Sequence, residues 1–388
     1  MNNKYILIFL TLLLAVGVWL GIREYRRAQL NKMVGQMILV GFRGTSPDDE
    51  SVRELANDIR AGRIGGVILF SFDVASGVAD GIPRNEIRWQ TKSRNIIDID
   101  QVRELNDYLQ NAASARPPLF VSIDFEGGRI SRILPEHRFD FVLDSAKELA
   151  ANYPPETVGE MYYELGIRLR DLGFNVNFAP TVDVDINPHS PAIGAMGRAF
   201  SDDAALVTKY GRAASDGLAR ANIIYSLKHF PGHGSADVDS HHGTVDITNT
   251  WVESELIPYR ELARTDMPGM VMVAHVFKKT LDAEFPASLS PKIVDGMLRT
   301  DIGFDGVVIT DDLQMGAIYE HYGLRETLRL AILAGNDIML LGNCMTYTEN
   351  LGRIAYGEII DMVRRGEIPR SRIKESYRRI IKLKGDIK

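Results

Sequence analysis

The chain has 388 residues, of which 45% are hydrophobic, enough to bury a large core as one α/β domain or two smaller ones. The formal net charge of -6 is mild, and no basic run precedes the C-terminal helix, so nucleic acid is not an expected partner. Cys344 is the only cysteine. This excludes an intramolecular disulfide, a cysteine-rich zinc site and a lipid-bearing cysteine near the N-terminus.

A run of apolar residues precedes the expected fold. Residues 5–22 carry no charge, and such a segment is long enough to cross a bilayer core of roughly 30 Å as a helix. We predict a single-pass transmembrane anchor with a short linker over residues 1–32. A cleavable signal peptide is the alternative because residues 15–17 include two small residues, although residues 18–20 continue the apolar run. The flanking Lys and Arg residues mildly favour a cytoplasmic C-terminal side.

From residue 33 onward, short apolar runs alternate with amphipathic segments of helix length. The expected strands are 37–41, 66–70, 119–124, 176–182, 223–228, 270–275, 306–310 and 337–341. The expected helices include 51–60, 101–115, 156–171, 204–221 and 326–334. This alternation predicts an α/β fold, a (β/α)8 TIM-type barrel forming a single catalytic domain over residues 33–388. A doubly wound open sheet is the alternative, but it usually has fewer strands and a Gly-rich phosphate loop, and no such loop is present.

Two further helices, at 346–365 and 370–384, are expected to close the chain, and no second domain follows. The basic residues of the last helix are expected on a solvated face: Arg378, Arg379, Lys382 and Lys384.

Polar residues follow the expected strands at the ends that a barrel gathers around one mouth. Two long loops, 71–99 and 183–201, are expected to build a substrate pocket on the same rim. Such carboxylates, imidazoles and cations can bind a polyhydroxylated ligand with directional hydrogen bonds. The strand-end residues are Asp124, Glu126, Arg132, Asp183, Asp185, Lys228, His229, His275, Asp311 and Asp312.

The stretch 227–243, LKHFPGHGSADVDSHHG, is the most distinctive loop. It holds four of the chain's eight histidines and directly follows an expected buried strand. Loops of this kind on a rigid scaffold commonly carry catalytic groups. One interpretation is a zinc hydrolase site, because its side chains include suitable ligand types: His229, His233, His241 and Asp239.

KHFPGHG followed by DSH resembles the signature of glycoside hydrolase family 3, in its β-N-acetylglucosaminidase branch. Residues 123–132 resemble the D-x-E-G-G-R-x-x-R segment of that family, and residues 309–315 resemble its [ST]-D-D-L-x-M nucleophile segment. The likeness extends from about residue 33 to the end of the chain.

The resemblance implies a role for individual residues. The nucleophile falls on Asp311, and the acid/base falls on His241, assisted by Asp239. Substrate-binding positions fall on Asp124, Arg132, Arg198, Lys228 and His229. The match at Arg198 is less regular, because the segment 193–200 is two residues longer than the usual I-G-x-R-S-F. His242 is the neighbouring alternative for the acid, and the family's D-S-H pattern favours His241.

The resemblance implies a retaining exo-β-N-acetylglucosaminidase that acts as a monomer on peptidoglycan fragments, with no cofactor and no metal. A histidine acid departs from the usual pair of carboxylates. An imidazole can exchange a proton near neutral pH, provided that a neighbour such as Asp239 stabilises its charged form. A wall-degrading activity favours an extracytoplasmic catalytic domain. The alternatives are a family 3 β-glucosidase, a zinc hydrolase and a non-catalytic wall-binding barrel, and either water or phosphate can be the sugar acceptor.

Overall fold

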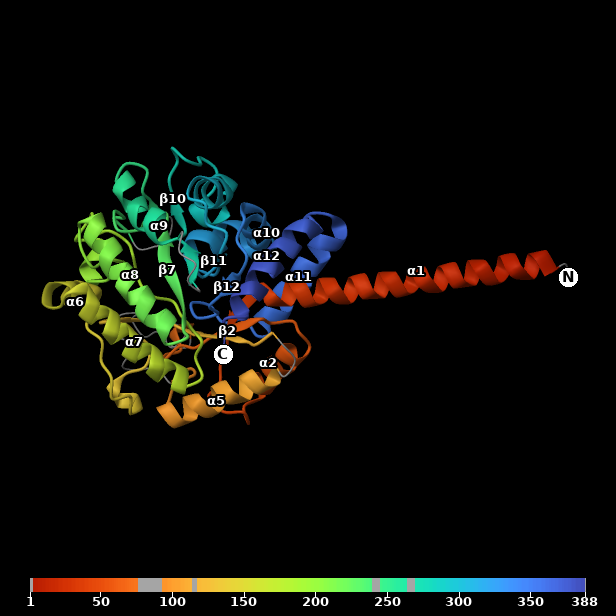
Figure 1. Ribbon diagram of the computed structural model, residues 1–388, viewed down its shortest axis with the longest axis horizontal. Helices are drawn as coiled ribbons and strands as arrows, with labels where there is room; N and C mark the ends of the chain where they lie inside the picture. The colour runs from red at the N-terminus through yellow and green to blue at the C-terminus, as the bar shows by residue number, and fades with distance from the viewer. Residues whose placement is uncertain (1–2, 76–92, 114–116, 239–244, 264–268, 388) are drawn as a thin grey trace.

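The computed structural model describes residues 3–75, 93–113, 117–238, 245–263 and 269–387. Eight parallel strands form its centre and follow one another in chain order around a curved sheet (Figure 1). They are β1 (Ile38–Gly41), β2 (Gly66–Ile68), β3 (Phe120–Ile123), β6 (Val176–Asn177), β7 (Ile224–Phe230), β9 (Gly269–Val273), β11 (Val307–Thr310) and β12 (Met339–Leu341). Every expected strand is present, although the one expected at 176–182 contributes only two residues.

The sheet comes close to forming a complete ring. β12 pairs with β1, with Ile38 opposite Met339, and a single parallel bridge between Ile309 and Ile338 brings β12 back to β11. The strands are buried on both faces, which explains why they read as continuous apolar runs rather than as alternating ones. The expected α/β barrel is therefore observed as a nearly closed parallel ring.

Helices surround the ring and cover its outer face (Figure 1). The longer ones are α2 (Glu50–Arg60), α5 (Ile99–Ala112), α7 (Pro155–Asp171), α8 (Ala204–Arg220), η6 (Lys292–Asp301), α10 (Gly316–Ala334), α11 (Leu351–Arg365) and α12 (Arg370–Lys384). In α2, apolar residues recur along one face and are buried, as expected for a helix packed on a sheet. The Asp98 carboxylate caps α5 by accepting from the amides of Asp100 and Gln101.

The remaining elements are short. Two helices, α6 (Ala146–Asn152) and α9 (Ile257–Leu262), and four helical turns, η1 (Pro135–His137), η2 (Gly194–Met196), η4 (Glu253–Leu256) and η5 (Ala287–Leu289), lie between the main elements. Two small strand pairs also form there: β4 (Phe125–Gly127) with β5 (Ile130–Ser131), and β8 (Val245–Asp246) with β10 (Val276–Phe277).

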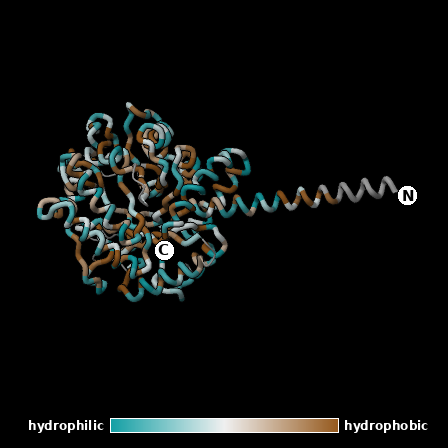
Figure 2. Tube along the Cα trace, in the orientation of Figure 1, coloured by the Kyte–Doolittle hydropathy of each residue, from teal (hydrophilic) through white to brown (hydrophobic). Residues whose placement is uncertain are grey.

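The first helix, α1 (Asn3–Gln36), packs on the barrel at its C-terminal end, where Leu30, Met33 and Val34 are buried. Its other end projects away from the barrel (Figure 1), and hydrophobic residues lie along the described part of this arm (Figure 2). Among the described residues, no helix is long and apolar enough to cross a membrane. The structure thus gives no support to the transmembrane span expected at residues 5–22.

One expectation about the last helix is wrong. Lys384 was expected on a solvated face but is only 2% exposed. Its ammonium donates to Gln36 Oε1, the Gly65 carbonyl and the Pro118 carbonyl, each at 2.7 Å. Burial lowers the pKa of Lys384 well below its ordinary value, yet only the charged form has three donors for these three acceptors. Lys384 therefore ties α12 to the end of α1 and to the loops that precede β2 and β3.

Arg379 also leaves the expected solvated face. Its guanidinium contacts Asp305 at 3.0 Å and the buried Asp337 at 3.5 Å. Sequence periodicity along a helix does not reveal buried carboxylates on other elements, which is why these two basic residues were placed on the surface.

We expect Lys384→Ala to lower the free energy of unfolding by about 3 kcal/mol, because it removes the donor from Gln36 Oε1 and from the Pro118 carbonyl, and one of two donors from the Gly65 carbonyl. Lys382→Ala, on the exposed face of the same turn, should change it by less than about 0.5 kcal/mol. Denaturant unfolding followed by circular dichroism measures both. Equal, small effects of the two substitutions would contradict the role assigned to Lys384.

Candidate active site

The carboxyl ends of the strands surround a cavity of about 290 Å³. This is the end of a barrel where strand-end residues from distant parts of the chain converge. Six of the expected site residues line this one cavity: Asp124, Arg132, Arg198, Lys228, His229 and Asp311. The expected acid/base residues, His241 and Asp239, lie outside the described residues.

At the floor of the cavity, Glu126 is 5% exposed and accepts two hydrogen bonds from Arg198, at 2.8 and 2.7 Å. Lys228 Nζ lies 2.6 Å from the same carboxylate and 2.9 Å from Asp124 Oδ1. Burial alone would raise the pKa of Glu126, but the charges of Arg198 and Lys228 outweigh it and hold that pKa well below its ordinary value. The pair of carboxylates likewise raises the pKa of Lys228 against the effect of burial. Glu126, Arg198 and Lys228 are thus ionised together in one hydrogen-bonded network.

A second network orients His229. Its Nδ1 lies 2.7 Å from Asp183 Oδ2, and its Nε2 lies 3.2 Å from Arg198 Nη2. Because Arg198 can only donate, the network assigns the proton of a neutral His229 to Nδ1. Asp183 also accepts from the backbone amides of His229 and His233. These contacts hold the pKa of Asp183 below its ordinary value although burial opposes them.

Asp311 and Asp312 follow β11 but do different things. The Asp311 carboxylate lines the cavity, and its Oδ1 accepts from the Asp312 amide at 2.8 Å. Oδ1 of Asp312 instead accepts from the amides of Gly342 and Gln314, at 2.8 and 3.0 Å. Asp312 therefore ties the end of β11 to the loop after β12, although it lines the cavity as Asp311 does.

Apolar side chains also line the cavity. Phe70, Phe72, Met345 and Cys344 line it, and the Arg132 guanidinium lies 5.8 Å from the centre of the Phe70 ring. A cavity lined by both charged groups and aromatic side chains can hydrogen-bond the polar groups of a ligand while packing against its apolar parts.

The base of the loop that carries Asp239 and His241 is built into the barrel. A Cβ at Gly234 would lie 1.7 Å from the Val184 carbonyl oxygen, so only glycine fits there. The Gly234 amide donates to Glu255 Oε2 at 3.0 Å. Glu255 belongs to η4 and is fully buried, and this burial raises its pKa to about 7.

Three residues of the site had no assigned role in the sequence analysis. Glu126 and Asp183 were noted only as strand-end residues, and Glu255 was not singled out at all. The D-x-E spacing could have indicated Glu126, because its neighbour Asp124 was identified. Glu255 lies in a short helical turn of ordinary composition, and no local pattern points to it.

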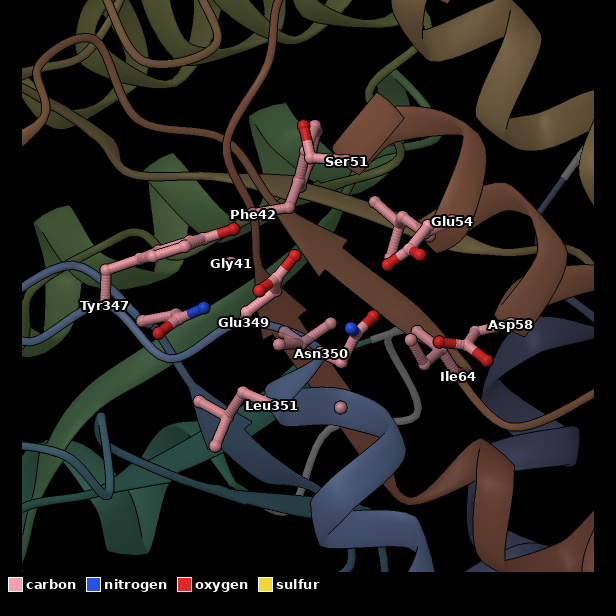
Figure 3. A pocket seen from close by; sticks show the side chains of 14 residues that line it. Gly41, Phe42, Ser51, Glu54, Asp58, Ile64, Tyr347, Glu349, Asn350 and Leu351 are labelled. Carbon is pink, nitrogen blue, oxygen red and sulfur yellow. The ribbon is translucent and has the colours of Figure 1, made fainter. Parts of the chain in front are cut away.

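Figure 3 shows a second, smaller cavity of about 50 Å³ between α2 and the start of α11. Glu54, Asp58 and Glu349 lie around it, but Asp58 is already paired with Arg63 and Arg353. In the described part of the chain, no three His, Cys, Asp or Glu side chains converge as metal ligands. Asp239 and His241 of the zinc alternative lie outside that part.

A nearly closed α/β barrel with carboxylates, cations and apolar side chains around a cavity at the carboxyl ends of its strands has the layout of a barrel enzyme's active site. Residues 29–383 match the glycosyl hydrolase family 3 N-terminal domain, and the chain belongs to this family. The resemblance seen in its motifs is therefore confirmed.

Individual relatives carry hexosaminidase names. The chain is 38% identical over 276 residues to beta-hexosaminidase LpqI of Mycobacterium tuberculosis, which covers 69% of this chain and 68% of that protein. It is 33% identical over 316 residues to beta-hexosaminidase A of Pseudoalteromonas piscicida, and spans about half (52%) of that longer protein. Among solved structures, a family 3 β-N-acetylglucosaminidase from a Paenibacillus species superposes with a TM-score of 0.79 at 32% identity. That alignment covers 92% of this chain and 62% of the other.

Glu255 should make stability fall as pH rises. Its pKa is raised from 4.5 to about 7 in the folded state, so its contribution is complete below about pH 4.5 and is lost as pH rises through about 7. Glu255→Gln should remove up to about 3 kcal/mol of this decline, since one pKa unit corresponds to ~1.4 kcal/mol. Urea unfolding at a series of pH values measures this change in the free energy of unfolding. Glu253→Gln, exposed on the same turn, is the matched control, and parallel pH profiles for wild type and Glu255→Gln would contradict the assignment.

Proposed function

We propose that this chain is a retaining exo-β-N-acetylglucosaminidase that removes terminal β-linked N-acetylglucosamine, with peptidoglycan fragments as its natural substrate. The observation that carries the proposal is that Asp311 shares one cavity with Asp124, Arg132, Arg198, Lys228 and His229. The names of the family relatives, beta-hexosaminidase and β-N-acetylglucosaminidase, support the choice of sugar.

The dimensions of the cavity favour action at a chain end. Its volume of about 290 Å³ lies just below the usual range of ligand pockets, roughly 300–1,000 Å³. One sugar ring fits such a space better than a run of several rings. In this arrangement, Asp124, Lys228 and Arg132 hold hydroxyl groups, while Arg198 and His229 are held in place by Glu126 and Asp183.

Asp311 then attacks the anomeric carbon, and the leaving oxygen takes a proton from the acid. A bond forms between a carboxylate oxygen and the sugar as the glycosidic bond breaks, and an acceptor later displaces the carboxylate with overall retention. The hydrogen bond from the Asp312 amide orients Asp311. In the proposal, His241 supplies the proton and recovers it from the acceptor, and Asp239 stabilises its charged form.

Activity on an aryl β-N-acetylglucosaminide beside an aryl β-glucoside, in buffers with and without phosphate, tests the proposal. We expect strong preference for the N-acetylglucosaminide. Preference for the glucoside would favour the β-glucosidase alternative, activity abolished by a chelator and restored by zinc would favour the zinc hydrolase, and no turnover of either would favour a wall-binding barrel. Phosphate dependence would identify the acceptor.

Asp311→Ala should reduce turnover by at least ~10⁴-fold, because the nucleophile has no substitute, while the thermal midpoint stays near that of wild type. Asp312→Ala should instead destabilise the fold by about 1–3 kcal/mol, since it leaves the amides of Gly342 and Gln314 without an acceptor. Steady-state kinetics and thermal unfolding of both variants separate the two roles. An active Asp311→Ala enzyme beside a dead but stable Asp312→Ala enzyme would reverse the assignment.

The effect of His241→Ala should depend on the leaving group. General acid catalysis is typically worth ~10²–10⁴-fold, and a natural disaccharide with a poor alcohol leaving group needs it more than an acidic phenol does. Asp239→Ala should give a milder version of the same pattern, and the double variant should be little worse than His241→Ala. An equal loss on good and poor leaving groups would show that His241 only positions the sugar. The acid would then be sought at His242 or among the other carboxylates of the rim, because Arg198 and Lys228 hold the pKa of Glu126 too low for it to supply a proton.

We also propose that the projecting arm of α1 attaches the enzyme to a membrane, with the barrel outside the cytoplasm. The support is the exposure of large apolar side chains on this arm, among them Leu14 at 70% and Trp19 at 58%. Exposed apolar side chains on a single helix are stabilised when the helix enters a lipid phase. Protease treatment of intact cells, or a reporter fused to the C-terminus, tests on which side of the membrane the barrel lies.

A further inference from the structure

A basic groove of about 730 Å³ lies where α1 meets α11 and α12. Arginines come into it from three separate elements: the middle of α1, the last turn of α11 and the first turn of α12. Apolar residues of α1 complete its walls. The lining residues are Trp19, Ile22, Arg23, Arg26, Arg27, Leu30, Arg364 and Arg370.

The charge of this groove is hardly neutralised by the protein. Of the arginines that line the groove, only Arg27 has a carboxylate within ion-pair distance in the described part of the chain, Glu24 at 3.9 Å, and both side chains are largely exposed. Asp361 of α11 is paired with arginines outside the groove, Arg365 and Arg325. A concentration of cations in a protein with a net charge of -6 indicates an anionic partner.

The groove is held in shape by contacts between its walls. Arg370 donates a hydrogen bond to the Arg26 carbonyl, and Leu30, 5% exposed, packs α1 against the barrel. The Arg23 guanidinium lies 5.5 Å from the Trp19 ring centre. The positive end of α12 faces the same space, since Arg370 is the first residue of that helix.

Just beyond the arginines, the helix becomes apolar. Trp19 and Ile22 are 58% and 47% exposed, and the exposed apolar residues continue toward the N-terminus through Leu14, Val16 and Val18. Arginine beside tryptophan at the border of an apolar segment is the arrangement typical of a membrane interface. Guanidinium groups also match phosphate oxygens with paired hydrogen bonds.

We propose that this groove binds the phosphate headgroups of anionic phospholipids and thereby fixes the barrel against a negatively charged membrane surface. The proposal rests on the membrane attachment proposed above and goes beyond it, because it assigns lipid selectivity to Arg364 and Arg370 on the barrel itself. Arginines near an anionic surface contribute to binding roughly additively.

The topology places this groove away from the active site. β1 begins directly after α1, and α11 runs back along the barrel after β12, so the groove lies toward the amino ends of the strands. The cavity with Asp311 lies at their carboxyl ends. A membrane bound at the groove therefore leaves the mouth of the barrel open to substrate.

The experiment is flotation of the full-length chain with vesicles of phosphatidylcholine alone and of phosphatidylcholine with phosphatidylglycerol, at low salt. We expect the wild-type protein to bind both, with a clear excess on the anionic vesicles that falls as salt is raised. Arg364→Glu/Arg370→Glu should reduce that excess roughly twentyfold, while binding to neutral vesicles and turnover of an aryl substrate stay unchanged.

Two further variants keep the test decisive. Lys374→Glu/Lys382→Glu makes the same change in net charge at exposed positions of α12 outside the groove, and it should keep most of the excess. Arg364→Glu alone preserves the hydrogen bond from Arg370 to Arg26, so it remains usable if the double variant misfolds. It should reduce the excess binding to anionic vesicles roughly fivefold. An unchanged excess in the Arg364 and Arg370 variants would overturn the proposed binding of lipid headgroups by the groove, but not the membrane attachment of α1. Failure of the wild type to bind either vesicle would overturn both the groove and the membrane attachment.

Discussion

Glu126 is a carboxylate with almost no access to water, and it stays ionised because Arg198 contacts both of its oxygens and Lys228 contacts one of them. A buried charge is costly unless it is paired and hydrogen-bonded, and the same holds for each partner. The three groups therefore depend on one another, and they come from three different strand ends or loops. Their mutual pairing fixes where the floor of the cavity lies.

The rest of the site follows from this floor. Arg198, held by Glu126, presents its guanidinium to His229 Nε2, and Asp183 holds the other nitrogen of the same ring. Lys228, held between two carboxylates, keeps Asp124 beside the cavity. Groups that bind a sugar must be oriented before the ligand arrives, because reorientation costs binding energy. The barrel supplies this orientation. The loop that leads to Asp239 and His241 starts at Gly234, whose amide donates to Glu255.

Much of the fold could be predicted from the sequence, because buried parallel strands leave continuous apolar runs and the helices between them leave a regular period. All eight strands were expected, and six expected site residues do line one cavity. The features that the sequence did not reveal depend on contacts between distant segments of the chain. The burial of Lys384 rests on acceptors from residues 36, 65 and 118, and no pattern within α12 reveals them. The support that Glu255 gives to Gly234 is of the same kind.

The central claim is that Asp311 forms a covalent bond with the sugar. The most direct test is to incubate the enzyme with an activated fluorinated N-acetylglucosaminide whose glycosyl-enzyme forms faster than it breaks down, then to digest the protein and locate the adduct by mass spectrometry. We predict one sugar per chain, esterified to Asp311. An adduct on Asp312 or on another carboxylate, or turnover with inversion and no adduct, would contradict it.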